Sequence, residues 1–191
     1  MKRVLLDACV LYPTVTREML LGAAARGLFC PLWSARILDE WARAVAAKLP
    51  DEAEVARVEI ALLRSRWPHA EVPPSAALEA QLFLPDPDDC HVLAAAITGR
   101  AETLVTLNRA DFPTRTLAAH DMRRLAPDPF LLGLWLDHRG EMAAVADAVH
   151  ARASELAGAD LSLRGLLKKA RLPRLGKALA RAPLASVGRS L

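Results

Sequence analysis

The sequence is organised around Leu84-Pro85-Asp86-Pro87-Asp88-Asp89-Cys90-His91-Val92-Leu93-Ala94-Ala95-Ala96, which packs three carboxylates into a short stretch and continues as an apolar helix. Pro87 suits the first helical position, because its missing N–H would be unpaired there anyway. Asp86 is then the expected N-cap, with Asp89 at the third helical position. The helix dipole favours one or two acids in this turn, but a third adds repulsion that a divalent cation would relieve. The stretch is therefore either a well-capped helix start or part of a metal site.

Composition restricts the class of protein. The chain has 191 residues, which suggests one domain with a small appendage, and 53% hydrophobic residues, which is enough for a sizeable core. No apolar run approaches the roughly 18 residues of a membrane span, so we expect no membrane association. The three cysteines form neither a zinc pattern nor a disulfide framework, which favours a cytoplasmic location. Glycine-rich dinucleotide and Walker-type phosphate loops are both missing.

Charge is distributed unevenly along the chain. All 22 acidic residues precede position 161, whereas every charged residue of the segment 161–191 is basic. Its cationic residues are Arg164, Lys168, Lys169, Arg171, Arg174, Lys177, Arg181 and Arg189. An acidic body with a basic tail indicates a polyanionic partner, although a solvated basic helix would have the same composition.

Short apolar runs alternate with helical patterns along the first two thirds of the chain. The runs at 3–6, 28–32, 70–72, 103–106 and 122–125 are expected strands. This alternation predicts an α/β fold with a central parallel sheet and helices on both faces. Sites in such sheets form beyond the carboxyl ends of the strands, where Asp7 and the Asn108/Asp111 segment would lie.

A boundary is expected at Pro127-Asp128-Pro129, with Asp128 as the N-cap of the next helix. Beyond it the pattern is purely helical. We therefore expect a domain at 1–129 and a helical C-terminal extension with a basic tail at 130–191.

Four acidic positions are candidate site residues: Asp7 after the first strand, Glu40 in the helix capped by Ser34, Asp89, and Asp111 after the strand that ends at Thr106. Each has an ordinary alternative role. Asp7 can form a turn, Glu40 can be an exposed helical residue, and Asp89 and Asp111 can be capping residues.

The order of these pieces resembles the PIN-domain nucleases, particularly the toxins of bacterial VapBC toxin–antitoxin systems. The matching stretches are Val4-Leu5-Leu6-Asp7-Ala8-Cys9-Val10-Leu11, Ile37-Leu38-Asp39-Glu40-Trp41, Asp86 to Ala96, and Leu104-Val105-Thr106-Leu107-Asn108-Arg109-Ala110-Asp111-Phe112. The resemblance implies a three-layer α/β/α sandwich whose acids hold Mg²⁺ or Mn²⁺ for hydrolysis of RNA phosphodiester bonds.

The resemblance also assigns roles. Asp7, Glu40, Asp89 and Asp111 would be the catalytic, metal-binding acids. Asp7 and Asp89 would bind the ion directly, and Glu40 would either bind it through water or orient the attacking water. Asp86, Asp88, Thr106 and Asn108 would support them, and Asp88 is an alternative to Asp89. Many relatives have Asn where this chain has Cys9, and Asp where it has Asn108; we expect Cys9 to weaken polar support, and Asp111 to supply the last acid.

RNA would need cationic contacts away from the acids, for which Arg109, Lys168, Lys169 and Arg171 are candidates. With a single Tyr and four residues each of Phe and Trp, the sequence offers no obvious stacking platform for bases. The expected partners are RNA, a small antitoxin protein and, as an open possibility, a second copy of the chain.

Four functional hypotheses remain at this stage. The first is a toxin ribonuclease restrained by an antitoxin, and the second a housekeeping RNA-processing PIN nuclease. The third is a PIN-fold binding module with weak or no catalysis, which the residues Cys9 and Asn108 favour. A phosphatase of the haloacid dehalogenase type has little support, because Cys9 stands where that chemistry needs a second Asp.

Overall fold

In the computed structural model, which describes residues 1–181, five parallel strands form one sheet in the order β3-β2-β1-β4-β5. Pro183 and Arg189 of the expected basic tail lie outside the described residues. The strands are β1 (Arg3–Leu6), β2 (Cys30–Ser34), β3 (Glu71–Val72), β4 (Thr103–Val105) and β5 (Arg123–Leu125).

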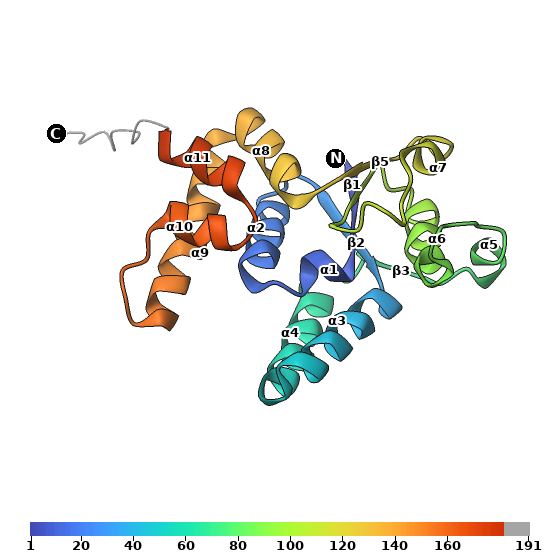
Figure 1. The fold of residues 1–191 in the computed structure, drawn as a ribbon, viewed down its shortest axis with the longest axis horizontal. Helices are drawn as coiled ribbons and strands as arrows, with labels where there is room; N and C mark the ends of the chain where they lie inside the picture. The colour runs from blue at the N-terminus through green and yellow to red at the C-terminus, as the bar shows by residue number, and fades with distance from the viewer. Residues whose placement is uncertain (182–191) are drawn as a thin grey trace.

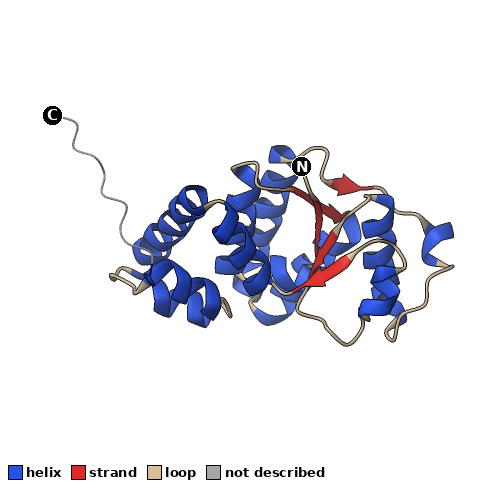
Figure 2. Ribbon diagram, turned by 90° about the horizontal axis from the view of Figure 1, so that it is seen from above, coloured by secondary structure: helices blue, strands red, loops and turns tan. Residues whose placement is uncertain are grey.

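Helices cover both faces of this sheet. Those associated with the sheet are α1 (Ala8–Leu11), α2 (Thr14–Ala25), α3 (Ala35–Lys48), α4 (Ala53–Arg66), α5 (Ala76–Glu79), α6 (Cys90–Thr98) and α7 (Thr114–Ala118). Two 3₁₀ turns, Pro50–Glu52 and Pro87–Asp89, precede α4 and α6. Figure 1 shows α2 on one side of the strands and α6 on the other, and Figure 2 shows the strands enclosed between helices. The predicted three-layer α/β/α sandwich is confirmed.

The sheet order has a switch point between β1 and β4. The connections through α2, α3 and α4 step from β1 toward β3, whereas the chain through α6 crosses back to β4 and continues to β5. Because right-handed crossovers in opposite directions place their helices on opposite faces, the carboxyl ends of β1 and β4 lie side by side beneath an open crevice. Asp7 and Thr106 are the first residues beyond these two strands.

Local sequence explains the elements that flank this crevice. Ser34 caps α3, since its Oγ accepts the N–H of Ile37 at 3.3 Å. Helix α6 is apolar all round and buried from Cys90 to Ala96. It ends at Gly99, where a Cβ atom would lie 2.9 Å from side-chain carbons of both Leu32 and Val72. Only glycine therefore lets α6 pack this closely against the sheet.

Four further helices complete the described chain: α8 (Pro127–Asp137), α9 (Arg139–Ala157), α10 (Leu163–Lys169) and α11 (Pro173–Arg181). Leu167, Leu172 and Leu175 of this segment are fully buried and belong to the same hydrophobic cluster as the strand residues Leu5 and Leu104. The predicted boundary near residue 129 thus falls within a continuous core, and the division into 1–129 and 130–191 stays a prediction.

The expectation that Asp128 caps its own helix is wrong. Ala126 is the N-cap of α8, and Asp128 lies in its first turn. The Asp128 carboxylate instead accepts the backbone N–H groups of Arg174 at 3.0 Å and Leu175 at 2.9 Å. A carboxylate from one helix therefore satisfies the free N–H groups that begin another, and joins α11 to α8.

No helix among residues 1–181 combines the length and the apolar composition needed to cross a lipid bilayer.

The variant Asp128→Ala tests the junction between Asp128 of α8 and the start of α11. It leaves two N–H groups at the start of α11 without their acceptor, so we expect the free energy of unfolding to fall by about 1–2 kcal/mol. Urea denaturation monitored by circular dichroism measures this loss of stability. Asp137→Ala is the matched control, because Asp137 is exposed at the other end of α8, and it should change stability by less than about 0.5 kcal/mol. Equal losses in the two variants would contradict the role of Asp128.

Candidate metal centre

The first acid of the site is held at the switch point by two neighbours. Asp7 is buried, with 6% of its surface exposed, and its backbone N–H donates to the carbonyl of Val105 at 3.2 Å. Its Oδ2 accepts the hydroxyl of Thr106 at 2.5 Å and the thiol of Cys9 at 3.1 Å. Side chains from the ends of β1 and β4 therefore orient this carboxylate together.

Cys9 takes a polar role despite its departure from the family pattern. Burial and the charge of Asp7 raise the pKa of its thiol to about 12, so the thiol stays protonated and can donate to Asp7. Its Sγ also accepts the N–H of Leu107 at 3.2 Å and lies 3.4 Å from Thr106 Oγ1. The thiol thus contacts the acid directly, although S–H is a weak hydrogen-bond donor, and the expectation that Cys9 weakens polar support at this position stays a prediction.

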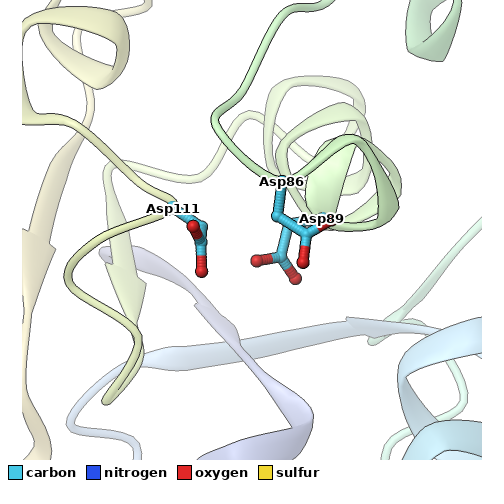
Figure 3. Close-up of side chains that lie close together, drawn as sticks. All are labelled: Asp86, Asp89 and Asp111. Atoms are coloured by element: carbon cyan, nitrogen blue, oxygen red, sulfur yellow. The ribbon is translucent and has the colours of Figure 1, made fainter.

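Three further acids converge on the other side of the crevice. Asp86, Asp89 and Asp111 each offer a carboxylate oxygen, and these oxygens all lie within 4.8 Å of one another. Asp86 and Asp89 come from the turn before α6, whereas Asp111 comes from the loop after β4; Figure 3 shows the three side chains gathered between the two segments.

The backbone of the turn explains which acids meet. Residues 87–89 form a 3₁₀ turn, in which positions three apart lie on the same side. Asp86 and Asp89 therefore face Asp111 together, while the exposed Asp88 lies outside the group. Asp86 is also the predicted N-cap, since its Oδ1 accepts the N–H of Asp88 at 2.9 Å.

Asn108 connects the two halves of the site. Its Nδ2 donates to Asp89 Oδ2 at 2.8 Å, and its Oδ1 accepts the N–H of Asp111 at 3.4 Å. Its own N–H donates to Thr106 Oγ1 at 2.9 Å. A continuous hydrogen-bonded path thus runs from Asp7 through Thr106 and Asn108 to Asp89.

The charges of these acids are felt most strongly at Asp89. Burial, together with the charges of Asp7, Asp86 and Asp111, raises the pKa of Asp89 to about 6. Asp7 therefore belongs to the same electrostatic group as the three clustered acids. Oxygen donors of this kind suit hard divalent cations such as Mg²⁺ or Mn²⁺, and a bound cation would reverse the repulsion.

Glu40 is placed differently from the other candidates. Its Oε1 lies 2.8 Å from Nε2 of the buried His91 and 3.5 Å from Nε of Arg36, and it is not part of the three-acid group. Burial opposes its ionisation, but the hydrogen bond and charge of His91 and the charges of Arg36 and Arg43 outweigh burial and lower its pKa. Glu40 is therefore held as a carboxylate beside the site.

His91 is the site residue that sequence analysis missed. The five histidines have no ligand spacing, and a histidine inside an apolar helix is usually read as a core residue. The available signal was its position two residues after Asp89, in the first turn of the helix that begins at the site.

The four candidate RNA contacts are all exposed. Arg109 is in the loop between Asn108 and Asp111, and its carbonyl accepts Arg124 Nη1 at 2.7 Å. Lys169 and Arg171 line a cavity that Cys9 and Glu40 also line, whereas Lys168 does not.

Comparison with known proteins now identifies the family. The family model described as "PIN domain" matches residues 3–110, more than half of the chain, and the chain belongs to the PIN-domain family. The chain is also 50% identical over 44 residues to "Putative ribonuclease VapC50" of Mycobacterium tuberculosis. That match covers 23% of this chain and 26% of the relative's own length. No solved structure matches the chain.

The pKa of Asp89 makes stability depend on pH. Its folded value of about 6 exceeds the value of about 3.9 in an unfolded chain, so the folded state binds this proton more tightly. Stability of the metal-free protein should therefore fall as pH rises through the interval between about 4 and about 6. Asp89→Asn removes this charge, and we expect it to be more stable than the unsubstituted protein at pH 7.5 but not at pH 4.

Chemical denaturation in EDTA at the two pH values measures this difference. Asp88→Asn is the matched control, because Asp88 is an adjacent acid outside the cluster and should gain nothing at pH 7.5. A pH-independent effect of Asp89→Asn would show that the pKa of Asp89 is not raised in the folded protein.

Proposed function

We propose that the protein is a metal-dependent endoribonuclease that hydrolyses RNA phosphodiester bonds. The observation that carries this proposal is the meeting of Asp86, Asp89 and Asp111 within 4.8 Å, next to a buried Asp7, at the switch point of a PIN-family sheet. The name of the matching relative, a ribonuclease, supports RNA as the substrate class.

Each residue has a role in this proposal. Asp7 and Asp89 bind the ion directly, and Asp86 and Asp111 complete the acidic group around it. When bound, the divalent ion would lower the pKa of a water molecule and stabilise developing charge on the phosphate. Thr106, Cys9 and Asn108 hold the carboxylates in place by the hydrogen bonds described above.

Glu40 acts on the attacking water rather than as part of the acidic group. His91 and Arg36 keep it ionised, so it can accept a hydrogen bond or a proton from that water. By family resemblance, in-line attack would leave a 5′-phosphate and a 3′-hydroxyl.

We further propose that the enzyme is a toxin of the VapC type, restrained by a small antitoxin that covers the acidic crevice. The likeness to VapC50 supports this role. A housekeeping RNA-processing nuclease is the alternative, and a short adjacent reading frame encoding an antitoxin would distinguish the two. Cytoplasmic location and a second copy of the chain as partner stay predictions.

A non-catalytic binding module gains little from the structure. The two departures that favoured it, Cys9 and Asn108, both make polar contacts with the acids they would otherwise leave unsupported. Catalysis therefore remains the better proposal.

The proposal is tested by incubating purified protein with single-stranded RNA and mapping the 5′ ends of the products. Mg²⁺ or Mn²⁺ should support cleavage, and EDTA should stop it. Asp7→Asn and Asp89→Asn should each reduce the rate by more than about 100-fold, beyond the roughly 10–100-fold cost of losing a supporting partner.

Asp39→Asn is the matched control, because Asp39 is exposed on α3 next to Glu40 in sequence. It should cleave at the rate of the unsubstituted protein. Cleavage that persists in EDTA, or in both site variants, would refute the proposed function.

A further inference from the structure

A cavity of about 570 Å³ opens beside the acidic site, and residues from both ends of the chain line it. Cys9 and Tyr12, from α1 and its C-cap, form one part of its wall. Glu40 and Lys48 lie on the same face of α3 and form another. The end of α10 and the turn that follows it supply Lys169, Ala170 and Arg171. Its volume falls in the range of about 300–1,000 Å³ that is common for ligand pockets.

The lining of the cavity carries one acidic and three basic side chains. The acidic one is Glu40, and Cys9, which also lines the cavity, donates a hydrogen bond to Asp7. Lys48, Lys169 and Arg171 contribute three exposed cations to the lining. None of these three cations lies within 4.0 Å of a carboxylate of residues 1–181. Their charges are therefore available to an anion placed next to the acidic site.

The turn that carries Lys169 and Arg171 is fixed to the nuclease core from two sides. Thr16 Oγ1, on α2, donates to the carbonyl of Ala170 at 3.1 Å. On the other side of the turn, Asp128 accepts the first N–H groups of α11. The two basic residues thus have backbone positions set by the PIN fold itself.

Arg171 has an unfavourable backbone conformation at this turn. Its φ angle is +60°, in the left-handed region where glycine is the usual residue after a helix. The Leu172 N–H that follows donates to Leu167 O at 2.8 Å, which closes the end of α10. A glycine would satisfy the same backbone with less strain, so the local fold does not account for the arginine.

We propose that this cavity is a subsite for one nucleotide of the RNA strand, next to the phosphate that is cleaved, and that the C-terminal helices complete it. Lys48, Lys169 and Arg171 bind the phosphate that follows along the strand, and Tyr12 offers an aromatic ring to the base. The inference rests on the proposed ribonuclease function. Tyr12 supplies the stacking surface that composition alone did not reveal; its ring centroid lies 5.1 Å from Lys48 Nζ.

Arg171→Gly separates the role of the side chain from that of the backbone. We expect it to weaken binding of a fluorescent single-stranded RNA, measured by anisotropy in EDTA, by about fivefold, and to reduce the slope of log Kd against log salt concentration by about 0.7. In cleavage assays KM should rise while kcat stays within about twofold. Thermal stability should be equal or higher, because glycine relieves the strained φ angle.

Arg100→Gly is the matched control. Arg100 is also an exposed arginine with a positive φ angle, +53°, at the end of a helix. It lies just before β4, at the edge of the sheet opposite the acidic site. This variant makes the same chemical change in the same backbone conformation, and should bind RNA with the affinity and salt dependence of the unsubstituted protein.

A second pair of variants tests the aromatic ring. Tyr12→Phe keeps the ring and should leave RNA affinity unchanged, whereas Tyr12→Leu removes it and should weaken binding at least threefold. If Arg171→Gly fails to fold, Arg171→Asn provides the same test, since asparagine also tolerates a left-handed backbone.

The outcomes distinguish the two levels of the proposal. If the unsubstituted protein cleaves RNA but Arg171→Gly and Arg100→Gly bind RNA equally well, the subsite does not exist and the cavity serves another occupant, such as a protein segment. If the unsubstituted protein cleaves no RNA with Mg²⁺ or Mn²⁺, the ribonuclease function itself is refuted.

Discussion

The hydrogen bond from Thr106 to Asp7 holds together the centre of this molecule. It joins the first residues beyond β1 and β4, the two strands between which the sheet order reverses. Without such a partner, a buried carboxylate at this position would be costly to leave unpaired. With it, Asp7 is fixed at the crevice, and the loop after β4 is positioned so that Asn108 and Asp111 reach Asp89.

This arrangement has a cost that also explains its chemistry. The carboxylates repel one another when no cation is present, and burial together with this repulsion raises the pKa of Asp89. Only a tightly packed frame can hold them close, and α6, buried along nearly its whole length and packed against the sheet at Gly99, provides it. The stability of the frame is thus used to keep a destabilising group of charges in place.

The sequence predicted the layers of the fold because these depend on local patterns, and local patterns also marked the acidic candidates. Strand runs that end in Asp7 or Thr106, and an acidic helix start at Asp86, are visible without coordinates. These patterns did not predict which of the acids come together in space. Asp86 joins the group and Asp88 does not, because residues three apart in this turn lie on the same side and Asp88 lies on another.

Contacts between remote segments could not be predicted at all from these patterns. The pairing of Glu40 with His91 depends on how α3 and α6 approach each other from different parts of the chain. The local rule that predicted Asp128 as the N-cap of its own helix failed, because its carboxylate accepts the first N–H groups of α11 instead. Tertiary packing determines such contacts between distant residues, and local patterns in a single sequence give little information about it.

The anchoring of the α10–α11 turn also has a consequence during protein synthesis. All strands and the acidic residues leave the ribosome before this turn does, and N-terminal units generally fold first. A nascent chain can therefore assemble its carboxylates while one wall of the neighbouring cavity is still missing. Under the proposed subsite, such an unfinished chain would bind RNA weakly, and full affinity would arise only once the later helices have docked.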